Sequence, residues 1–217
     1  SSLSVIAAGL SASGDELSWI QTSYLIAEVI VIPVTGYASR LLSTRIFYSI
    51  SAFGFTAMSL LCSFAWNIES MILFRALQGL FGGAMIPTAF GAIFILFPRS
   101  MQSKVSMIIG LVVTVAPTLG PTLGGYMTEI ASWHLMFLIN VIPGIYVCYT
   151  VYNYVDFDKP NYNLLKNFDY LGVISMAIGL GCLQYILEEG PKKDWLNDNH
   201  ILFFTVTTIS AFIILLI

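Results

Sequence analysis

The feature that most constrains this chain is a series of apolar stretches, each long enough to cross a lipid bilayer as a helix. Such a helix needs about 20 predominantly apolar residues. Two stretches, Leu17–Ser39 and Tyr170–Leu187, fit this pattern with at most one charge, Glu28. Four more contain no Asp, Glu, Lys or Arg: Ile46–Ile68, Ala76–Pro98, Val105–Thr128 and Leu135–Val155. The chain is only 10% charged, whereas soluble domains carry about 25% charged residues. We therefore predict an all-α membrane protein, a polytopic bundle of transmembrane helices.

The apolar pattern predicts six complete spans and two partial ones. Shorter apolar runs lie at both ends of the chain, at Ser1–Leu10 and Ile201–Ile217, and are read as partial spans. The simplest expectation is a fragment of a larger polytopic protein, because Ser1 is not an initiator Met and no signal-peptide pattern precedes the first run. The six complete helices are predicted at Leu17–Ser39, Arg45–Trp66, Ser70–Phe97, Ser103–Thr128, His134–Tyr154 and Asp169–Leu187.

One connection between spans is long and polar. Asp156–Phe168 contains Pro160 and is the best candidate for a boundary within the chain. It would separate an N-terminal transmembrane bundle (1–155) from extra transmembrane helices (169–217), with a cytoplasmic linker (156–168) between them. Asp169 is a residue type that caps helix N-termini, so we expect the next helix to begin there.

Basic residues predict the orientation in the membrane. Cytoplasmic loops of membrane proteins collect Lys and Arg. Six basic loop residues fall on alternate loops, and the opposite side has only Lys192 and Lys193. We therefore assign the cytoplasmic side to the three loops with Arg40 and Arg45, Arg99 and Lys104, and Lys159 and Lys166.

Two charged side chains lie within apolar stretches. A charge inside hydrocarbon costs about 3 kcal/mol on insertion scales, so Arg75 and Glu28 are candidates for function. Their distances along the chain from Trp66 and Trp19 place them at similar depths, where a carboxylate and a guanidinium can pair or exchange a proton. Arg75 can instead snorkel outward, and Glu28 can bond a neighbouring helix. Gln78 lies on the same helix face as Arg75, and both charges are expected to face the bundle interior.

A second pattern lies in the stretch from Ala116 to Gly125. Pro117, Pro121 and Gly125 are spaced by four residues, as are Gly120 and Gly124. Each Pro lacks an N–H and frees a carbonyl one turn earlier. The spacing predicts a bent helix with one smooth face, on which another helix packs closely and slides. A bent structural helix is the alternative interpretation.

A short basic segment, Gly36–Arg45, joins the first two complete spans. Its length predicts a tight turn at the cytoplasmic face, with Gly36, Arg40 and Arg45 as candidate motif residues. Anchoring by positive charge alone is the simpler alternative.

Together these segments resemble the major facilitator superfamily, in particular its fourteen-helix drug:proton antiporters of the EmrB/QacA type. Leu73–Gly83 is similar to the R-x-x-Q-G motif of the fourth helix, and Gly120–Gly125 to the G-P-x-x-G-G antiporter motif of the fifth. Gly36–Arg45 matches the loop motif only in part, because Arg40 stands at the usual Asp position and Ser43 at the second Gly position. The resemblance covers nearly the whole chain and places it from the end of helix 1 to the start of helix 8.

The resemblance implies a function, namely proton-coupled efflux of small amphipathic or drug-like molecules by alternating access. Arg75 and Gln78 would belong to proton coupling and the segment 117–125 to the conformational change; Glu28 is added to the coupling residues because of its burial. The expected setting is the cell inner (plasma) membrane, with the lipid bilayer and a small-molecule substrate as partners and a proton gradient in place of a cofactor. A periplasmic adaptor is left open, because EmrB-like proteins use one and QacA-like ones do not. We expect no nucleic-acid partner.

Other functions are weaker interpretations of the same sequence. Export of an endogenous metabolite or siderophore stays open, and a non-transporting membrane sensor would not account for the buried charges. The sequence shows no catalytic pattern such as H-E-x-x-H or Gly-x-Ser-x-Gly, so we do not expect an enzyme. Cys62, Cys148 and Cys182 are dispersed in apolar runs, which indicates packing rather than a disulfide framework or a metal site.

Overall fold

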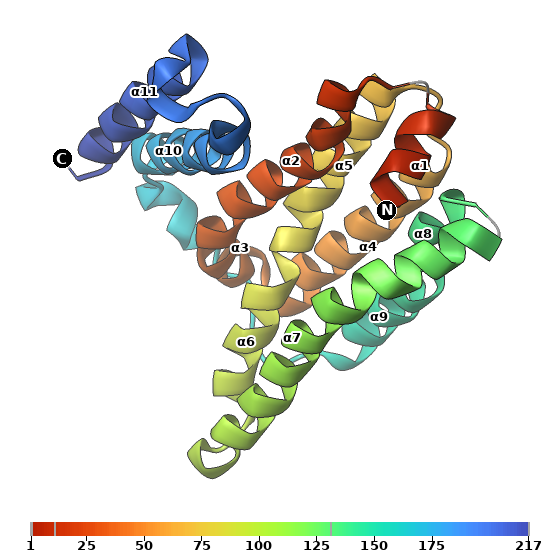
Figure 1. Ribbon diagram of the computed structural model, residues 1–217. Helices are drawn as coiled ribbons and strands as arrows, with labels where there is room; N and C mark the ends of the chain where they lie inside the picture. Colours follow the sequence, from red (N-terminus) through yellow and green to blue (C-terminus); the bar gives the residue numbers. More distant parts are fainter. Residues whose placement is uncertain (1, 11, 131, 217) are drawn as a thin grey trace.

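The computed structural model describes residues 2–10, 12–130 and 132–216, and is built from helices (Figure 1). Ser1 and Ile217, the outermost residues of the two predicted partial spans, lie outside this part of the chain. Short 3-10 turns occur at Ile32–Val34, Tyr162–Asn167, Gly190–Lys192 and Trp195–Asn197. The α-helices are α1 (Ser2–Gly9), α2 (Gly14–Val31), α3 (Thr35–Leu42), α4 (Thr44–Ser63), α5 (Ile68–Gly83), α6 (Met85–Leu96), α7 (Arg99–Ile130), α8 (His134–Leu138), α9 (Val141–Tyr154), α10 (Tyr170–Glu189) and α11 (Asn199–Leu216).

Seven helical segments of the described chain are long and apolar enough to cross a membrane. Six of them correspond to the six predicted spans, and no β-strand interrupts any of them in the described ranges. The all-α prediction is therefore confirmed. One expectation needs correction, because the run predicted as a partial span at the C-terminal end forms an 18-residue helix, Asn199–Leu216, which meets the length for a seventh span.

Prolines divide three of the predicted spans into two helices each. The break between α5 and α6 falls at Ala84, three residues before Pro87, and that between α8 and α9 falls at Ile139 and Asn140, just before Pro143. A Pro cannot donate to the carbonyl four residues earlier and its ring crowds that carbonyl, so the helix ends about one turn before it. Pro33 lies inside the 3-10 turn between α2 and α3.

The helices pack as a bundle with one helix pair at its side. Helix α2 packs along α5, and α4 lies between α5 and α9. Helices α10 and α11 pack on each other, and α10 also contacts α2 (Figure 1). The predicted cap at the start of α10 is confirmed, because Asp169 Oδ1 accepts a hydrogen bond of 2.8 Å from the Gly172 N–H.

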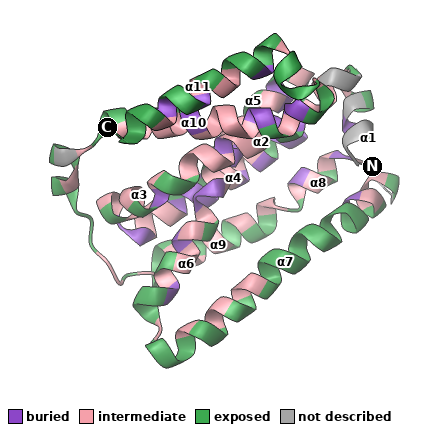
Figure 2. Ribbon diagram, turned by 60° about the vertical axis from the view of Figure 1, so that its left-hand side comes forward, coloured by how far each residue is buried: buried purple, intermediate pink, exposed green. Residues whose placement is uncertain are grey.

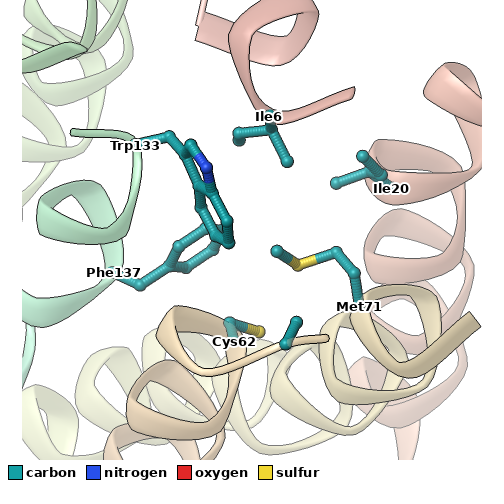
Figure 3. Close-up of a cluster of buried hydrophobic side chains, with 7 residues drawn as sticks. Ile6, Ile20, Cys62, Met71, Trp133 and Phe137 are labelled. Atoms are coloured by element: carbon teal, nitrogen blue, oxygen red, sulfur yellow. The ribbon is translucent and has the colours of Figure 1, made fainter. Parts of the chain in front are cut away.

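Buried residues are most frequent on α4 and also occur on α2, α5 and α10, whereas α7 is exposed along most of its length (Figure 2). An apolar cluster joins α1, α2, α4, α5 and α8 at one end of the bundle. It contains Ile20, Met71, Trp133 and Phe137, together with Ile6, Cys62 and Ala65 (Figure 3). This cluster lies directly beside Arg75 along α5 and fixes how α2 and α5 meet.

Candidate functional site

Arg75 lies where α5 faces α2, and its guanidinium points at groups of the protein. Its Nε donates a hydrogen bond of 3.2 Å to the Ile20 carbonyl oxygen, and its Nη1 donates one of 2.8 Å to Gln78 Oε1. The guanidinium carbon also lies 4.3 Å from the centre of the Tyr24 ring. A guanidinium in an apolar environment needs such partners, because an unpaired charge there is expensive. The structure thus places Arg75 toward the interior, as the sequence predicted.

Gln78 connects Arg75 to helix α4. Its side chain is 1% exposed, and its Nε2 donates a hydrogen bond of 2.5 Å to Ser59 Oγ. The Cys62 thiol lies 3.9 Å from the same Gln78 Oε1 that Arg75 contacts. Gln78 therefore bonds on both sides, accepting from Arg75 and donating to Ser59. We call Tyr24, Ser59, Arg75 and Gln78 the Arg75 network.

Two members of this network were not predicted from the sequence. Ser59 is a single small polar residue in an apolar stretch, which is common in membrane helices and gives no signal of its own. Tyr24 lies five residues after Trp19 and looks like an interfacial aromatic. Its distance from Glu28 is one helical turn, which places both on one face of α2, and this was the only available signal.

Glycines allow the close approach of α2 and α5 that the Arg75 network requires. A Cβ at Gly79 would collide with the Tyr24 carbonyl oxygen, and one at Gly83 would lie 2.7 Å from the Glu28 carbonyl oxygen. Backbone therefore meets backbone over one turn of each helix. Small residues four apart support this kind of helix contact in membranes. Gly79 and Gly83 therefore serve the packing of α2 against α5.

Glu28 lies one turn further along α2, at a pocket of about 310 Å³. The pocket is bordered by α2, α4, the α5–α6 junction and α7. Apart from Glu28, the lining side chains are apolar or aromatic, with Tyr24, Tyr48, Phe55 and Met85 among them. We find no ion pair between Glu28 and Arg75 in the described residues. The two charges therefore lie near the same α2–α5 contact, but the pairing considered from the sequence is not formed.

The Pro117–Gly125 segment lies in the middle of α7, which runs unbroken through Pro117 and Pro121. Residues 111–123 are all exposed, and a Cβ at Gly120 or Gly125 would have open space within 4 Å. Gly124 is buried. No helix of the described chain lies against Gly120, so the close packing of this face stays a prediction. A sequence pattern of small residues indicates that a neighbour can approach, but not which segment supplies it.

The loop motif at residues 36–45 forms a shorter turn than predicted. Helix α3 continues to Leu42, so that Ser43 alone separates it from α4. Gly36 and Arg40 are one helical turn apart, and Arg40 Nε donates a hydrogen bond of 2.9 Å to the Gly36 carbonyl oxygen. Arg45 Nη1 lies 3.9 Å from Asp156 Oδ1, an exposed pair. Ser43 has a φ of 76°, a value that favours glycine, and it stands where the resembling family has its second Gly.

Comparison with known proteins agrees with this geometry. The family model described as Major Facilitator Superfamily matches residues 1–216. The chain belongs to this superfamily. Superfamily membership confirms the resemblance stated from the Arg75, Gly120 and loop motifs.

Several curated relatives are similar over most of the chain. A "Colistin resistance protein EmrB" of Acinetobacter baumannii is 46% identical over 201 residues, covering 93% of this chain and 39% of the relative. A "Probable multidrug resistance protein EmrY" of Escherichia coli is 32% identical over 208 residues, 96% of this chain and 40% of the relative. A "Multidrug export protein EmrB" of Haemophilus influenzae is 30% identical over 212 residues, 98% of this chain and 41% of the relative. The chain thus spans about two fifths of the length of these relatives, whose names are those of export and resistance proteins and not of enzymes.

Proposed function

We propose that this chain is part of an exporter that moves small amphipathic or drug-like molecules out across the cytoplasmic membrane in exchange for protons. The relatives named for multidrug export and colistin resistance support the export of drug-like molecules. The observation that carries the coupling is the Arg75 network, in which a guanidinium inside a membrane-length helix is held by Gln78 and the Ile20 carbonyl. Intramembrane ionisable groups mark substrate and proton pathways in transporters.

In this proposal Arg75 acts as a fixed positive charge and Glu28 as the group that gains and loses a proton. Glu28 lines a pocket of about 310 Å³, whereas the Arg75 guanidinium is bonded to protein atoms. A proton or a substrate therefore has access to Glu28 rather than to Arg75. Exchange between inward-open and outward-open states would alternate the side from which Glu28 is reached.

The proposal also includes the orientation. The structure brings the loop at residues 40–45 and the linker at 156–168 together, because the Asn161 N–H bonds the Arg40 and Leu41 carbonyls. Together with the start of α7, which holds Arg99 and Lys104, they carry the excess of basic residues, and we assign them to the cytoplasm. A periplasmic adaptor joins the proposal through the similarity to EmrB-type relatives.

The test uses everted membrane vesicles that contain the full-length protein. We expect Arg75→Ala to abolish drug transport driven by a proton gradient while the protein still inserts into the membrane. Arg99→Ala, which removes an exposed charge at the start of α7, is the matched control and should transport normally. Normal transport by Arg75→Ala would remove Arg75 from the mechanism.

Glu28→Gln tests the second half of the proposal. A neutral amide of the same shape cannot titrate, so the dependence of transport on pH should flatten while some substrate movement down its gradient persists. An unchanged pH profile in Glu28→Gln would count against proton handling at this residue and would leave the Arg75 result standing.

A further inference from the structure

The linker between α9 and α10, residues 156–168, lies against the turn between α3 and α4; we call it the strap. Asp158 Oδ2 accepts two hydrogen bonds of 2.8 Å, one from the Thr44 N–H and one from the Thr44 hydroxyl. Thr44 is the first residue of α4, and the first amides of a helix have no partner inside it. A carboxylate at a helix N-terminus is also favoured by the helix dipole. Asp158 thus caps α4 from 114 residues away.

The strap also bonds the end of the preceding helix. The Asn161 N–H is shared between the carbonyl oxygens of Arg40, at 3.1 Å, and Leu41, at 3.2 Å. These carbonyls belong to the last turn of α3, where the helix leaves acceptors unpaired. Within four residues, therefore, the strap supplies a missing acceptor to α4 and a missing donor to α3.

The residue at the centre of the turn, Ser43, is poorly suited to the backbone conformation that the turn requires. Ser43 has φ 76° and ψ 150°, a region that is essentially reserved for glycine and persists only where the surroundings enforce it. The turn's own cap is long, at 3.4 Å from the Ile46 N–H to Ser43 Oγ. Arg40 occupies the position at which the resembling family usually has an acid. The hydrogen bonds from the strap therefore stabilise a turn that its own residues stabilise only weakly.

The strap continues from this turn to the start of α10. The Phe168 ring packs on the Tyr37 ring of α3, with centroids 4.8 Å apart, and Asp169 follows immediately as the cap of α10. Both ends of the strap are therefore fixed to α3 and α4. This connection ties the α10–α11 pair to the cytoplasmic end of the bundle.

A small pocket beside the turn leaves room for movement. It has a volume of about 230 Å³ and lies between α3 and α6, with Arg40, Thr88, Gly91 and Asp158 in its wall. The second oxygen of Asp158, Oδ1, is buried and has no hydrogen-bond partner among the described residues. A carboxylate with one bonded and one unbonded oxygen can keep its hold on Thr44 while the turn shifts toward α6.

We propose that the strap is a clamp, in which Asp158 and Asn161 hold the α3–α4 turn and make its position depend on that of α10. The turn opens only when the strap lifts, and a displacement of α10 and α11 is transmitted to the ends of α3 and α4. This coupling stands apart from the proposed transport activity, since it rests on the strap and not on the Arg75 network.

Hydrogen exchange measured by mass spectrometry on the full-length protein in lipid nanodiscs tests the clamp. We expect Asp158→Ala to speed amide exchange in the segment 40–50 by about tenfold, with a parallel increase at 169–175, because a charged hydrogen bond at a helix start is lost. Asp158 lies outside both segments, so their intrinsic exchange rates are unchanged. Asp156→Ala is the matched control, since Asp156 belongs to the same strap but its Oδ1 lies 3.9 Å from Arg45 Nη1 in a solvent-accessible pair.

The outcomes separate clearly. Wild-type exchange in both segments of Asp158→Ala would overturn the clamp, and an increase confined to 40–50 would overturn the link to α10. If Asp158→Ala does not accumulate in the membrane, Asp158→Asn replaces it. The amide retains one acceptor oxygen and loses the charge, so about threefold faster exchange at 40–50 is expected, and no change would again refute the proposal. None of these measurements requires transport.

Discussion

The guanidinium of Arg75 donates a 2.8 Å hydrogen bond to the side-chain oxygen of Gln78, one turn further along α5. Gln78 in turn donates to Ser59 on α4. The charge on α5 is thereby connected to α4 through a neutral amide, and to α2 through the Ile20 carbonyl. Three helices meet at one charged group.

Removal of Gln78 is expected to destabilise this junction more than removal of Ser59. Gln78→Leu leaves Arg75 Nη1 without its acceptor, and a hydrogen bond to a charged group contributes about 1.5–3 kcal/mol. Ser59→Ala loses only a neutral bond, worth about 1 kcal/mol. Thermal unfolding in detergent should rank Gln78→Leu below Ser59→Ala and both below the wild type. The reverse order would mean that Arg75 finds another partner.

The glycines of α5 and α6 give a matched comparison. Gly79→Ala places a Cβ against the Tyr24 carbonyl and forces α2 and α5 apart, which is expected to cost about 1–3 kcal/mol. At Gly91 a Cβ meets nothing within 4 Å, so Gly91→Ala should be neutral or stabilise the helix by up to about 1 kcal/mol. Unfolding midpoints of the two variants check this. Equal midpoints would show that the α2–α5 contact adjusts freely.

Ser43→Gly is expected to stabilise the turn between α3 and α4. A non-glycine residue in this conformation costs about 1–3 kcal/mol, whereas the hydrogen bond lost from Ser43 Oγ is long, at 3.4 Å. Glycine removes the backbone strain and loses only this weak hydrogen bond. The variant should unfold at a higher temperature than the wild type, while Ser43→Ala should unfold at a lower one. A lower midpoint for the glycine variant would show that the side-chain cap outweighs the strain.

Gly120→Leu is expected to affect transport without affecting the fold of this chain. A Cβ at Gly120 has open space within 4 Å, as it does at Gly110 on the same helix. We expect both leucine variants to accumulate in the membrane normally. If the Pro117–Gly125 face contacts another part of the full-length transporter during the change of access, Gly120→Leu should reduce transport and Gly110→Leu should not. Equal activity of the two variants would assign the Gly120 motif to ordinary helix structure.

The hydrogen bonds of Asp198 at the start of α11 should make the stability of the protein depend on pH. The Ile201 and His200 amides donate hydrogen bonds to Asp198 Oδ1 and lower the pKa of this carboxyl. Because the folded pKa lies below the unfolded one, about 3.9, the stabilisation is complete at neutral pH and is lost as the pH falls through the folded pKa. Asp198→Ala should therefore lower the unfolding midpoint at neutral pH, and the difference should shrink in acid.

Asp198→Asn is the control for this effect. It keeps an oxygen acceptor for the α11 amides but does not titrate. The stability of Asp198→Asn should not change with pH through residue 198. Because the wild type loses stability in acid, the difference in unfolding midpoint between this variant and the wild type should also shrink there. A difference between Asp198→Ala and wild type that is the same at all pH values would show that the carboxylate charge plays no part in holding α11.

The fold was largely predictable because each span carries its own signal. The length of an apolar stretch determines whether a helix can cross a bilayer, and Asp169 and Pro87 mark a helix start and a bend locally. Contacts between residues far apart in the sequence carry no such local signal. Asp158 caps a helix that begins 114 residues earlier, at Thr44. The residues around Asp158 in the sequence do not indicate this partner.

The site was predictable in part for the same reason. Arg75 stood out because charge is rare in an apolar run, and Gln78 followed from helical spacing. Ser59 did not stand out, since a serine in a membrane helix is ordinary until its neighbour is known. The pairing of Glu28 with Arg75 was considered on depth alone, which places two groups at one level without orienting them. In the structure the guanidinium turns to Gln78 and Ile20.

The partners of Arg75 have a consequence for how the protein is made. Its carbonyl acceptor, Ile20, and the Tyr24 ring belong to α2, and Ser59, to which its network extends, belongs to α4. All three precede Arg75 in the chain and leave the ribosome before it. When α5 reaches the insertion machinery, the earlier helices already offer the groups that compensate its charge, whose unaided entry would cost about 3 kcal/mol. Synthesis from the N-terminus therefore brings Ile20, Tyr24 and Ser59 into the membrane before Arg75, whereas its partner Gln78 follows it.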